Sequence, residues 1–269
     1  MTDRGRTEYR PSSVSPPGDT LAELLEDKGL TQAELARRLD RPIKTINEIV
    51  KGKAAITPDT AVQLERALGA PADFWLAREC SYREWLAREK AREELKRWAG
   101  WLRELPVREM SAFGWIKPTN DRVEAVSECL KFFGVASVEA WRETYERPLA
   151  AFRASTKVKR DRGAVAAWLR RGELDGTAVE CAVFDAASFE SLLPSIRALT
   201  LETDPATFVP SLIEMCREAG VAVVFARAPK GCPASGAARW LNSAKPLIQL
   251  SLRYRTNDKL WFTFFHEVT

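Results

Sequence analysis

The chain has 269 residues, 45% of them hydrophobic and 29% charged, a composition typical of a well-cored globular protein of about two domains. No apolar run approaches the roughly 20 residues that cross a bilayer, and the N-terminus lacks the apolar core of a signal peptide, so we expect a cytoplasmic protein without membrane segments. The net charge of +4 is too small to indicate a nucleic-acid partner without a local charge pattern.

The N-terminal third begins with a segment that offers little to bury. Residues 1–18 are rich in Arg, Ser and Pro and predict a disordered tail. From Thr20 to about Met110 the spacing of apolar residues predicts successive helices. Three glycines mark the expected ends of the first helices, Gly29, Gly52 and Gly69.

Residues 31–53 predict two short helices packed across a tight turn. Thr31 suits an N-cap, and Glu34 three residues later completes a capping-box pattern. Asp40 lies at the turn, where a left-handed backbone is usually needed and where Asp is tolerated better than most residues. Pro42 suits the first turn of the second helix. The predicted buried positions of the two helices are Leu35, Ala36, Leu39, Ile46, Ile49 and Val50.

The second of these helices presents a polar stripe at i, i+3, i+4 and i+7 spacing, formed by Lys44, Asn47, Glu48 and Lys51. Such side chains can hydrogen-bond to base edges, and an apolar neighbour such as Ile43 can contact a thymine methyl group. Residues 31–53 carry a net charge of +3, which favours contact with phosphate. The candidate DNA-binding residues are Gln32, Arg41, Ile43, Lys44, Thr45, Asn47, Glu48, Lys51 and Lys53. The alternative is a helical bundle whose polar face meets water or another protein.

Residues 18–78, including the PADFWL ending, resemble the Cro/C1-type (XRE) helix-turn-helix of HigA-like antitoxins. The resemblance implies a five-helix repressor-like domain, placed at residues 19–80, whose recognition helix carries Ile43, Lys44, Asn47 and Glu48. It also implies a homodimer that binds a double-stranded operator, and either a transcriptional regulator or the antitoxin of a toxin–antitoxin module. Asp40 and Arg41 depart from the Gly and apolar residue that the wider family prefers.

The rest of the chain is first helical and then mixed. Residues 81–200 predict amphipathic helices whose aromatic residues belong to a core, and we expect a helical linker without chemistry of its own. Within residues 201–269, a helix near 205–219 precedes a β-rich run at 221–226, further alternating segments and a final helix from Asn257. The fold class is therefore mainly α, with a small α+β C-terminal part.

The cysteines argue against a disulfide framework or a thiolate zinc site. They are odd in number and contain no CxxC pair, so we expect reduced, mostly buried thiols at Cys80, Cys129, Cys181, Cys216 and Cys232.

The final helix carries the chain's single histidine, His266, followed by Glu267. In zinc peptidases of the HExxH type, two histidines four residues apart bind the metal and the glutamate acts as general base. The second histidine of that pattern would be position 270. The alternative interpretation is that His266 is an ordinary residue of a packed helix.

The C-terminal stretch resembles the ImmA/IrrE family of metallopeptidases in its order of strands followed by an HE helix. The resemblance implies that His266 is the first zinc ligand and Glu267 the general base of a domain at residues 201–269. The second histidine and a downstream ligand are absent from this sequence, so we expect a truncated domain that is inactive and holds Zn²⁺ at most weakly, unlike the full-length family. Two hypotheses stay open: a DNA-binding regulator, or a fragment of a zinc endopeptidase that cleaves a repressor protein.

Overall fold

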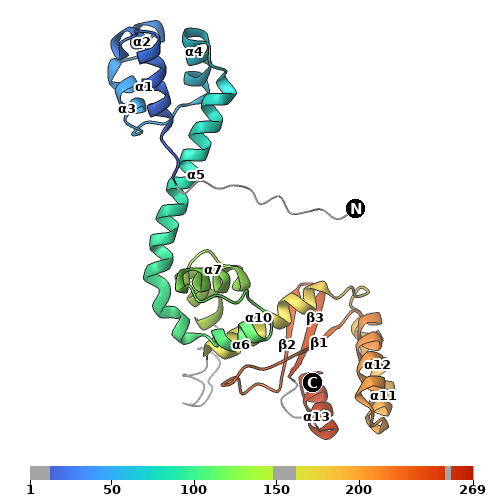
Figure 1. The fold of residues 1–269 in the computed structure, drawn as a ribbon. Helices are drawn as coiled ribbons and strands as arrows, with labels where there is room; N and C mark the ends of the chain where they lie inside the picture. Colours follow the sequence, from blue (N-terminus) through green and yellow to red (C-terminus); the bar gives the residue numbers. More distant parts are fainter. Residues whose placement is uncertain (1–12, 148–161, 252–255, 269) are drawn as a thin grey trace, which may run out of the picture. The chain divides into compact units, whose positions relative to one another are not determined.

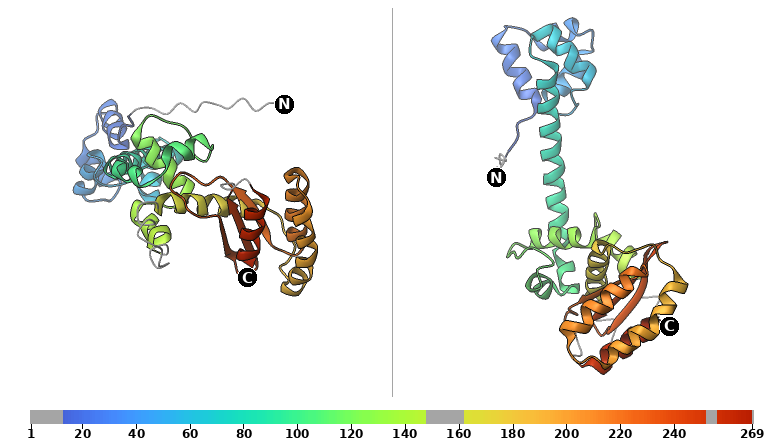
Figure 2. Two further views of the ribbon diagram at one scale, coloured as in Figure 1. Left: turned by 90° about the horizontal axis from the view of Figure 1, so that it is seen from below. Right: turned by 90° about the vertical axis from the view of Figure 1, so that its right-hand side faces the viewer.

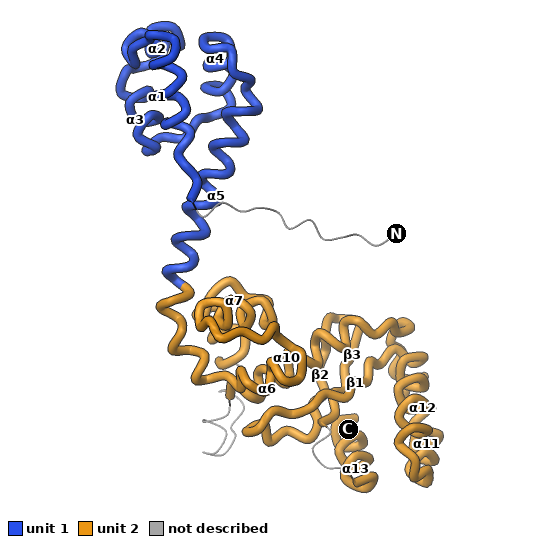
Figure 3. The backbone as a smooth tube through the Cα atoms, viewed as in Figure 1, with its two compact units in different colours: residues 1–94 blue, residues 95–269 orange. Residues whose placement is uncertain are grey.

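The computed structural model describes residues 13–147, 162–251 and 256–268, and most of them are helical (Figure 1). The predicted fold class, mainly α with a small C-terminal sheet, is confirmed. The chain divides into two compact units, residues 1–94 and 95–269 (Figure 3). Most of the predicted N-terminal tail, residues 1–12, lies outside the described residues. No helix in the described ranges combines the length and apolar character that crossing a bilayer requires.

The described residues of the first unit form five helices, whose bounds are α1 (Pro17–Asp27), α2 (Gln32–Arg38), α3 (Ile43–Val50), α4 (Pro58–Leu68) and α5 (Ala72–Arg97). The last residues of α5 belong to the second unit. Helices α1 to α4 gather around the first turns of α5 (Figure 2), and Trp75 of α5 is fully buried among their side chains. Of the buried positions expected in residues 31–53, all are buried except Val50, which is half-buried.

The start of α1 corrects the predicted boundary of the tail. The helix begins at Pro17, three residues before Thr20, and both Pro17 and Gly18 are buried. Proline suits this position because its missing N–H needs no partner in the first turn of a helix. Gly18 lies so close to the end of α3 that a Cβ atom there would be 2.3 Å from the carbonyl oxygen of Ile49. Residues that resembled a tail thus form part of the first unit's core.

The second unit contains helices on both sides of one sheet. Its α-helices are α6 (Val107–Ala112), α7 (Arg122–Phe133), α8 (Val138–Trp141), α10 (Arg162–Ala178), α11 (Ala186–Ala198), α12 (Pro205–Glu218) and α13 (Asn257–Val268). Shorter turns are the 3₁₀ helices η1 (Trp98–Glu104) and η4 (Leu199–Leu201) and the π-helical η2 (Arg142–Glu146). The strands are β1 (Ala222–Ala226), β2 (Gly236–Asn242) and β3 (Lys245–Ser251).

The sheet has the strand order β1-β3-β2, with β1 parallel and β2 antiparallel to the central β3. Helix α10 covers one face, where Trp168 and Gln249 of β3 are fully buried. Helices α12 and α13 cover the other face, with Phe208 and Phe264 buried against β1 and β3. Helix α10 comes from the segment expected to be a linker, so this segment supplies one wall of the sheet domain.

The aromatic residues of the middle region form a core, as predicted. Trp141 packs edge to face against both Trp101 and Phe133, with ring centroids 5.3 and 5.7 Å apart. Three of the five cysteines, Cys129, Cys216 and Cys232, are buried as expected, whereas Cys80 is exposed and Cys181 is half-buried. Burial raises the pKa of the Cys129 and Cys216 thiols to about 12, because the charged thiolate is poorly solvated there.

Candidate functional site

The turn between α2 and α3 has the geometry that the sequence predicts. Asp40 adopts a left-handed backbone with φ 49°, and the N–H of Arg41 returns to the carbonyl oxygen of Ala36 at 2.9 Å. Thr31 caps α2 by accepting a 3.1 Å hydrogen bond from the N–H of Glu34. The carboxylate of Glu34 instead accepts a 2.9 Å hydrogen bond from Arg38. Pro42 is the N-cap of α3 rather than a residue of its first turn.

The candidate DNA-binding residues differ in their accessibility. Those that project into solvent are Ile43, which is 56% exposed, together with Lys44, Lys51 and Lys53. The others are half-buried: Gln32, Arg41, Thr45, Asn47 and Glu48. Helix α3 buries Ile46 and Ile49 on its opposite side, so its outer surface is available for contact with a partner.

Side-chain contacts place the half-buried residues in defined positions. Asn47 donates a 3.3 Å hydrogen bond from Nδ2 to Oε1 of Gln32, which links α3 to the start of α2. Gln32 keeps its own amide hydrogens for another acceptor, such as a phosphate. Oε1 of Glu48 lies 3.9 Å from Nζ of Lys44, a long ion pair in contact with solvent that stabilises little.

Arg41 is held by a residue that the sequence did not point to. Its Nε donates a 2.7 Å hydrogen bond to Oε1 of Gln63 on α4. The two positions are 22 residues apart, and no spacing rule connects them. This hydrogen bond fixes the orientation of the guanidinium group. The N–H groups of its two terminal nitrogens can still donate to an acceptor outside the protein.

The exposed cations give this surface its charge. Lys51 and Lys53, after the end of α3, make no ion pair with any residue in the described ranges. Exposed lysines without acidic partners are suited to replace the counterions of a nucleic-acid backbone. The outer surface of α3 therefore combines base-reading residue types with flanking positive charge.

The predicted metal-site residues lie in the second unit, at the C-terminal end of α13. His266 is exposed and stacks on Phe262 with a centroid separation of 6.2 Å, and Glu267 is half-buried. Both line a shallow pocket with Gly236 at the start of β2, where a Cβ atom would lie 2.9 Å from Oε1 of Glu267. Within the described ranges, no three His, Cys, Asp or Glu side chains group closely enough to hold a metal ion. These residues by themselves do not meet the three-ligand requirement of a catalytic zinc.

The first unit thus defines a helix-turn-helix domain, and comparison with known proteins agrees. The Helix-turn-helix family matches residues 21–75. Virulence-associated protein A of Dichelobacter nodosus is 44% identical over 59 residues, covering 22% of this chain and 58% of that protein. The uncharacterized HTH-type transcriptional regulator YddM of Escherichia coli is 33% identical over 60 residues, covering 22% of this chain and 64% of that protein. The chain thus spans about three fifths of the length of these two relatives.

A further relative matches over a longer stretch. Antitoxin HigA-1 of Vibrio cholerae is 33% identical over 92 residues, covering 34% of this chain and 84% of that protein. The chain belongs to the XRE-type helix-turn-helix family that includes the HigA-like antitoxins. Among solved structures, a Pseudomonas aeruginosa antitoxin HigA with the higBA promoter is 30% identical, covers 29% of this chain and 86% of its own, and has a TM-score of 0.28. A HigA-family antidote protein from Coxiella burnetii is 28% identical, covers 31% and 91%, and has a TM-score of 0.28.

Proposed function

We propose that the protein is a sequence-specific DNA-binding transcriptional regulator. The observation that carries the proposal is the solvent-exposed surface of α3, where Ile43 and Lys44 lie beside a positioned Asn47 and two exposed lysines follow. The match of residues 21–75 to the Helix-turn-helix family supports it, as does the likeness to an uncharacterized protein named as an HTH-type transcriptional regulator. In this arrangement Lys44 and Asn47 read base edges, while Lys51 and Lys53 neutralise phosphates.

The proposal includes a homodimer on a palindromic operator, because the recognition helix of one helix-turn-helix domain covers only a half-site. The proposal also includes control of the protein's own promoter. The likeness to Antitoxin HigA-1 favours, as a variant of the same function, an antitoxin that binds a toxin protein. Both variants require the α3 surface to bind DNA, so the same experiment tests them.

The test compares Lys44→Ala with Lys53→Ala in the full chain, on DNA from upstream of its own gene and on random duplex of equal length. Lys44→Ala is expected to lose about 1–3 kcal/mol of binding to the operator and to relax the preference at one base pair. Lys53→Ala is expected to weaken binding to both duplexes alike, because a phosphate contact carries no sequence information. Fluorescence anisotropy across a salt series measures both effects.

Affinity of the unsubstituted protein is expected to fall steeply as salt rises, through release of counterions from the DNA. A substitution of an exposed cation away from α3, Arg103→Glu, is the matched control and should leave DNA binding unchanged. If the protein prefers no sequence at any salt concentration, or if both lysine variants show the same uniform loss, the assignment of α3 as recognition helix is wrong.

A second proposal concerns residues 201–269: we propose that they belong to an ImmA/IrrE-like metallopeptidase domain. The supporting observation is that Glu267 and His266 meet the antiparallel edge strand β2 in one shallow pocket. A domain of this kind would hold Zn²⁺ through His266 and further ligands, and the metal would supply a polarised water. Within this chain, Glu267 is the group placed to accept a proton beside β2.

We expect the 269-residue chain to bind Zn²⁺ weakly and to hydrolyse no peptide, because His266 offers one imidazole and a catalytic site takes three protein ligands. Appending one histidine at position 270 places two imidazoles at i and i+4 and should tighten Zn²⁺ binding at least tenfold. Appended alanine is the control, and Glu267→Gln should leave the affinity of the extended chain almost unchanged. Metal content by mass spectrometry after dialysis measures this. Equal zinc content in the histidine- and alanine-extended chains would contradict the proposed ligand role of His266.

A further inference from the structure

Strand β1 lies at an edge of the sheet, and the side of it that faces away from β3 has no strand of the described residues beside it. Within the described ranges, no backbone hydrogen bond joins Ala222–Phe225 to anything other than β3. At the end of the strand, the carbonyl oxygen of Ala226 accepts a 3.1 Å hydrogen bond from Nε1 of Trp168. Because alternate residues of a strand direct N–H and C=O to one side, an unpaired edge offers a row of donors and acceptors to another extended chain.

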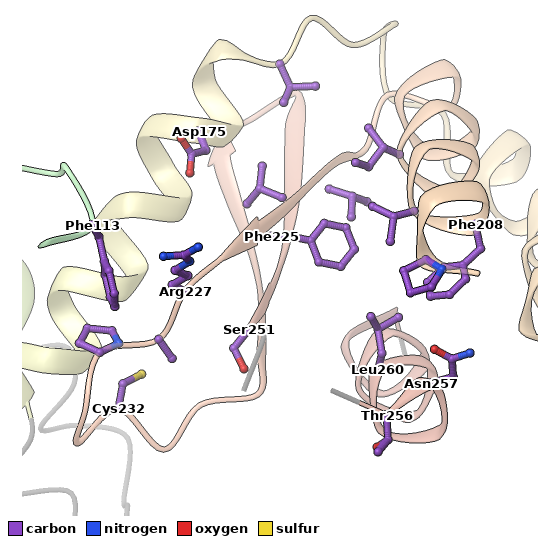
Figure 4. Close-up of a pocket in the computed structure, with 18 of the residues that line it drawn as sticks. Phe113, Asp175, Phe208, Phe225, Arg227, Cys232, Ser251, Thr256, Asn257 and Leu260 are labelled. Atoms are coloured by element: carbon purple, nitrogen blue, oxygen red, sulfur yellow. The ribbon is translucent and has the colours of Figure 1, made fainter. Parts of the chain in front are cut away.

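A groove of 1310 Å³ follows this edge (Figure 4). Its lining comes from both faces of the sheet, with Val179 beyond α10 on one side and Phe208 and Val209 of α12 on the other. Figure 4 shows α10 and α12 flanking β1, with the ring of Phe225 directed toward the α12 side. The volume exceeds the roughly 300–1,000 Å³ of pockets for drug-sized ligands, which favours a polymer as the occupant.

The unpaired charged side chains that line the groove are positive. Arg227 and Lys230 follow β1, are exposed, and make no ion pair with residues in the described ranges. The guanidinium of Arg227 lies 5.8 Å from the ring centroid of Phe113. The acidic residue that lines the groove, Asp175, is already paired with Arg171, whose Nε donates to its Oδ2 at 2.8 Å. Beside these residues, the carboxylate of Glu109, which does not line the groove, accepts a 3.2 Å hydrogen bond from the backbone N–H of Lys230. The groove itself therefore presents the two side-chain cations at the carboxyl end of β1 to an acidic partner.

A separate observation also indicates a ligand. Ser251 lines the groove at the end of β3, and its Oγ is buried without a hydrogen-bond partner in the described part of the chain. A buried hydroxyl without a partner is uncommon in native proteins, because its lost hydration is not replaced. A polar group of a bound chain in the groove would satisfy it.

We propose that the groove along β1 binds an extended, acidic segment of another protein by strand addition. The segment pairs its backbone with the outer edge of β1, places apolar side chains toward the α10 and α12 walls, and sets its carboxylates over Arg227 and Lys230. A second copy of the domain is disfavoured as the occupant, because its own β1 is flanked by the same two helices and would meet these walls before the strands could pair.

The test uses a labelled decapeptide with alternating Val and Thr residues in its centre and two Asp residues at each end. The peptide is titrated with the full chain, and binding is followed by fluorescence anisotropy. A peptide with Lys in place of Asp is expected to bind at least tenfold more weakly. Because only every second N–H of an added strand faces β1, N-methylation of one alternate set of residues should abolish binding, and N-methylation of the other set should preserve it. Hydrogen exchange at Ala222–Ala226 should slow when the Asp peptide binds.

The matching protein variant is Arg227→Glu with Lys230→Glu, which should weaken the Asp peptide at least tenfold and strengthen the Lys peptide. The control is Arg103→Glu with Arg122→Glu, two exposed cations of the same unit outside the groove, which should change neither affinity. Circular dichroism verifies that both variants fold. The proposal is wrong if the Asp peptide does not bind at millimolar concentration, or if the two N-methylated peptides behave alike. The proposal is also wrong if sedimentation shows that the unsubstituted protein self-associates and that Arg227→Glu with Lys230→Glu abolishes this, because a second copy would then occupy the groove.

Discussion

Replacing Trp168 by alanine is expected to lower the free energy of unfolding of the sheet domain by about 3–5 kcal/mol. The indole is fully buried between α10 and the sheet, beside Ala226 and Cys232. Its loss removes a large apolar contact and leaves the carbonyl oxygen of Ala226 without the indole N–H that it accepts at 3.1 Å. Truncation also removes packing next to Gln249, which donates to the backbone oxygen of Trp168 at 2.6 Å.

The matched control is Trp240→Ala, because the same residue type on β2 is 56% exposed. It contacts Phe184 edge to face and should cost about 1 kcal/mol, the range of such aromatic pairs. Urea unfolding of the full chain, followed by far-ultraviolet circular dichroism, measures both without depending on tryptophan fluorescence. Equal losses for the two variants would show that α10 does not depend on Trp168 for its position on the sheet.

Gly18→Ala is expected to destabilise the helix-turn-helix domain by about 1–3 kcal/mol, although alanine favours helices over glycine by about 1 kcal/mol. The new Cβ would lie 2.3 Å from the carbonyl oxygen of Ile49 and 2.4 Å from that of Val50. Backbone atoms cannot move aside as a flexible side chain can, so α1 must shift away from α3. Because α3 carries the proposed recognition surface, affinity for DNA should fall as well.

Hydrogen exchange of the full chain, followed by mass spectrometry, should show faster exchange in α1 and α3 of the Gly18→Ala protein. Gly100→Ala is the control, since nothing lies within 4 Å of its added Cβ and its backbone is not left-handed. Unchanged exchange in α1 and α3 would mean that the first unit accommodates the methyl group, and that the close approach of Gly18 to α3 is not required.

Local signals in the sequence were sufficient for the elements of the first unit. Thr31 and Thr57 cap α2 and α4 through hydrogen bonds to backbone N–H groups three residues later, an interaction within one turn of chain. Asp40 shows the left-handed backbone expected at the turn. The amphipathic spacing of α3 separated the buried Ile46 and Ile49 from the exposed Lys44 and Lys51. The composition of residues 13–18 misled the prediction, because the burial of Pro17 and Gly18 depends on α3.

In the second unit, periodicity located the strands and the last helix. The strand order β1-β3-β2 could not be predicted in this way, because it depends on which strands pair across the fold and not on any local pattern. For the same reason, the sequence showed α10 as a helix without showing that it covers the sheet.

Residue types, caps and helical faces follow from interactions within a few positions of the chain, so the sequence by itself determines them. The contacts that position function join distant positions, as Arg41 joins Gln63 across 22 residues and Trp168 joins Ala226 across 58. The open edge of β1 and its groove belong to this second group, because a strand is an edge only when the whole sheet is assembled.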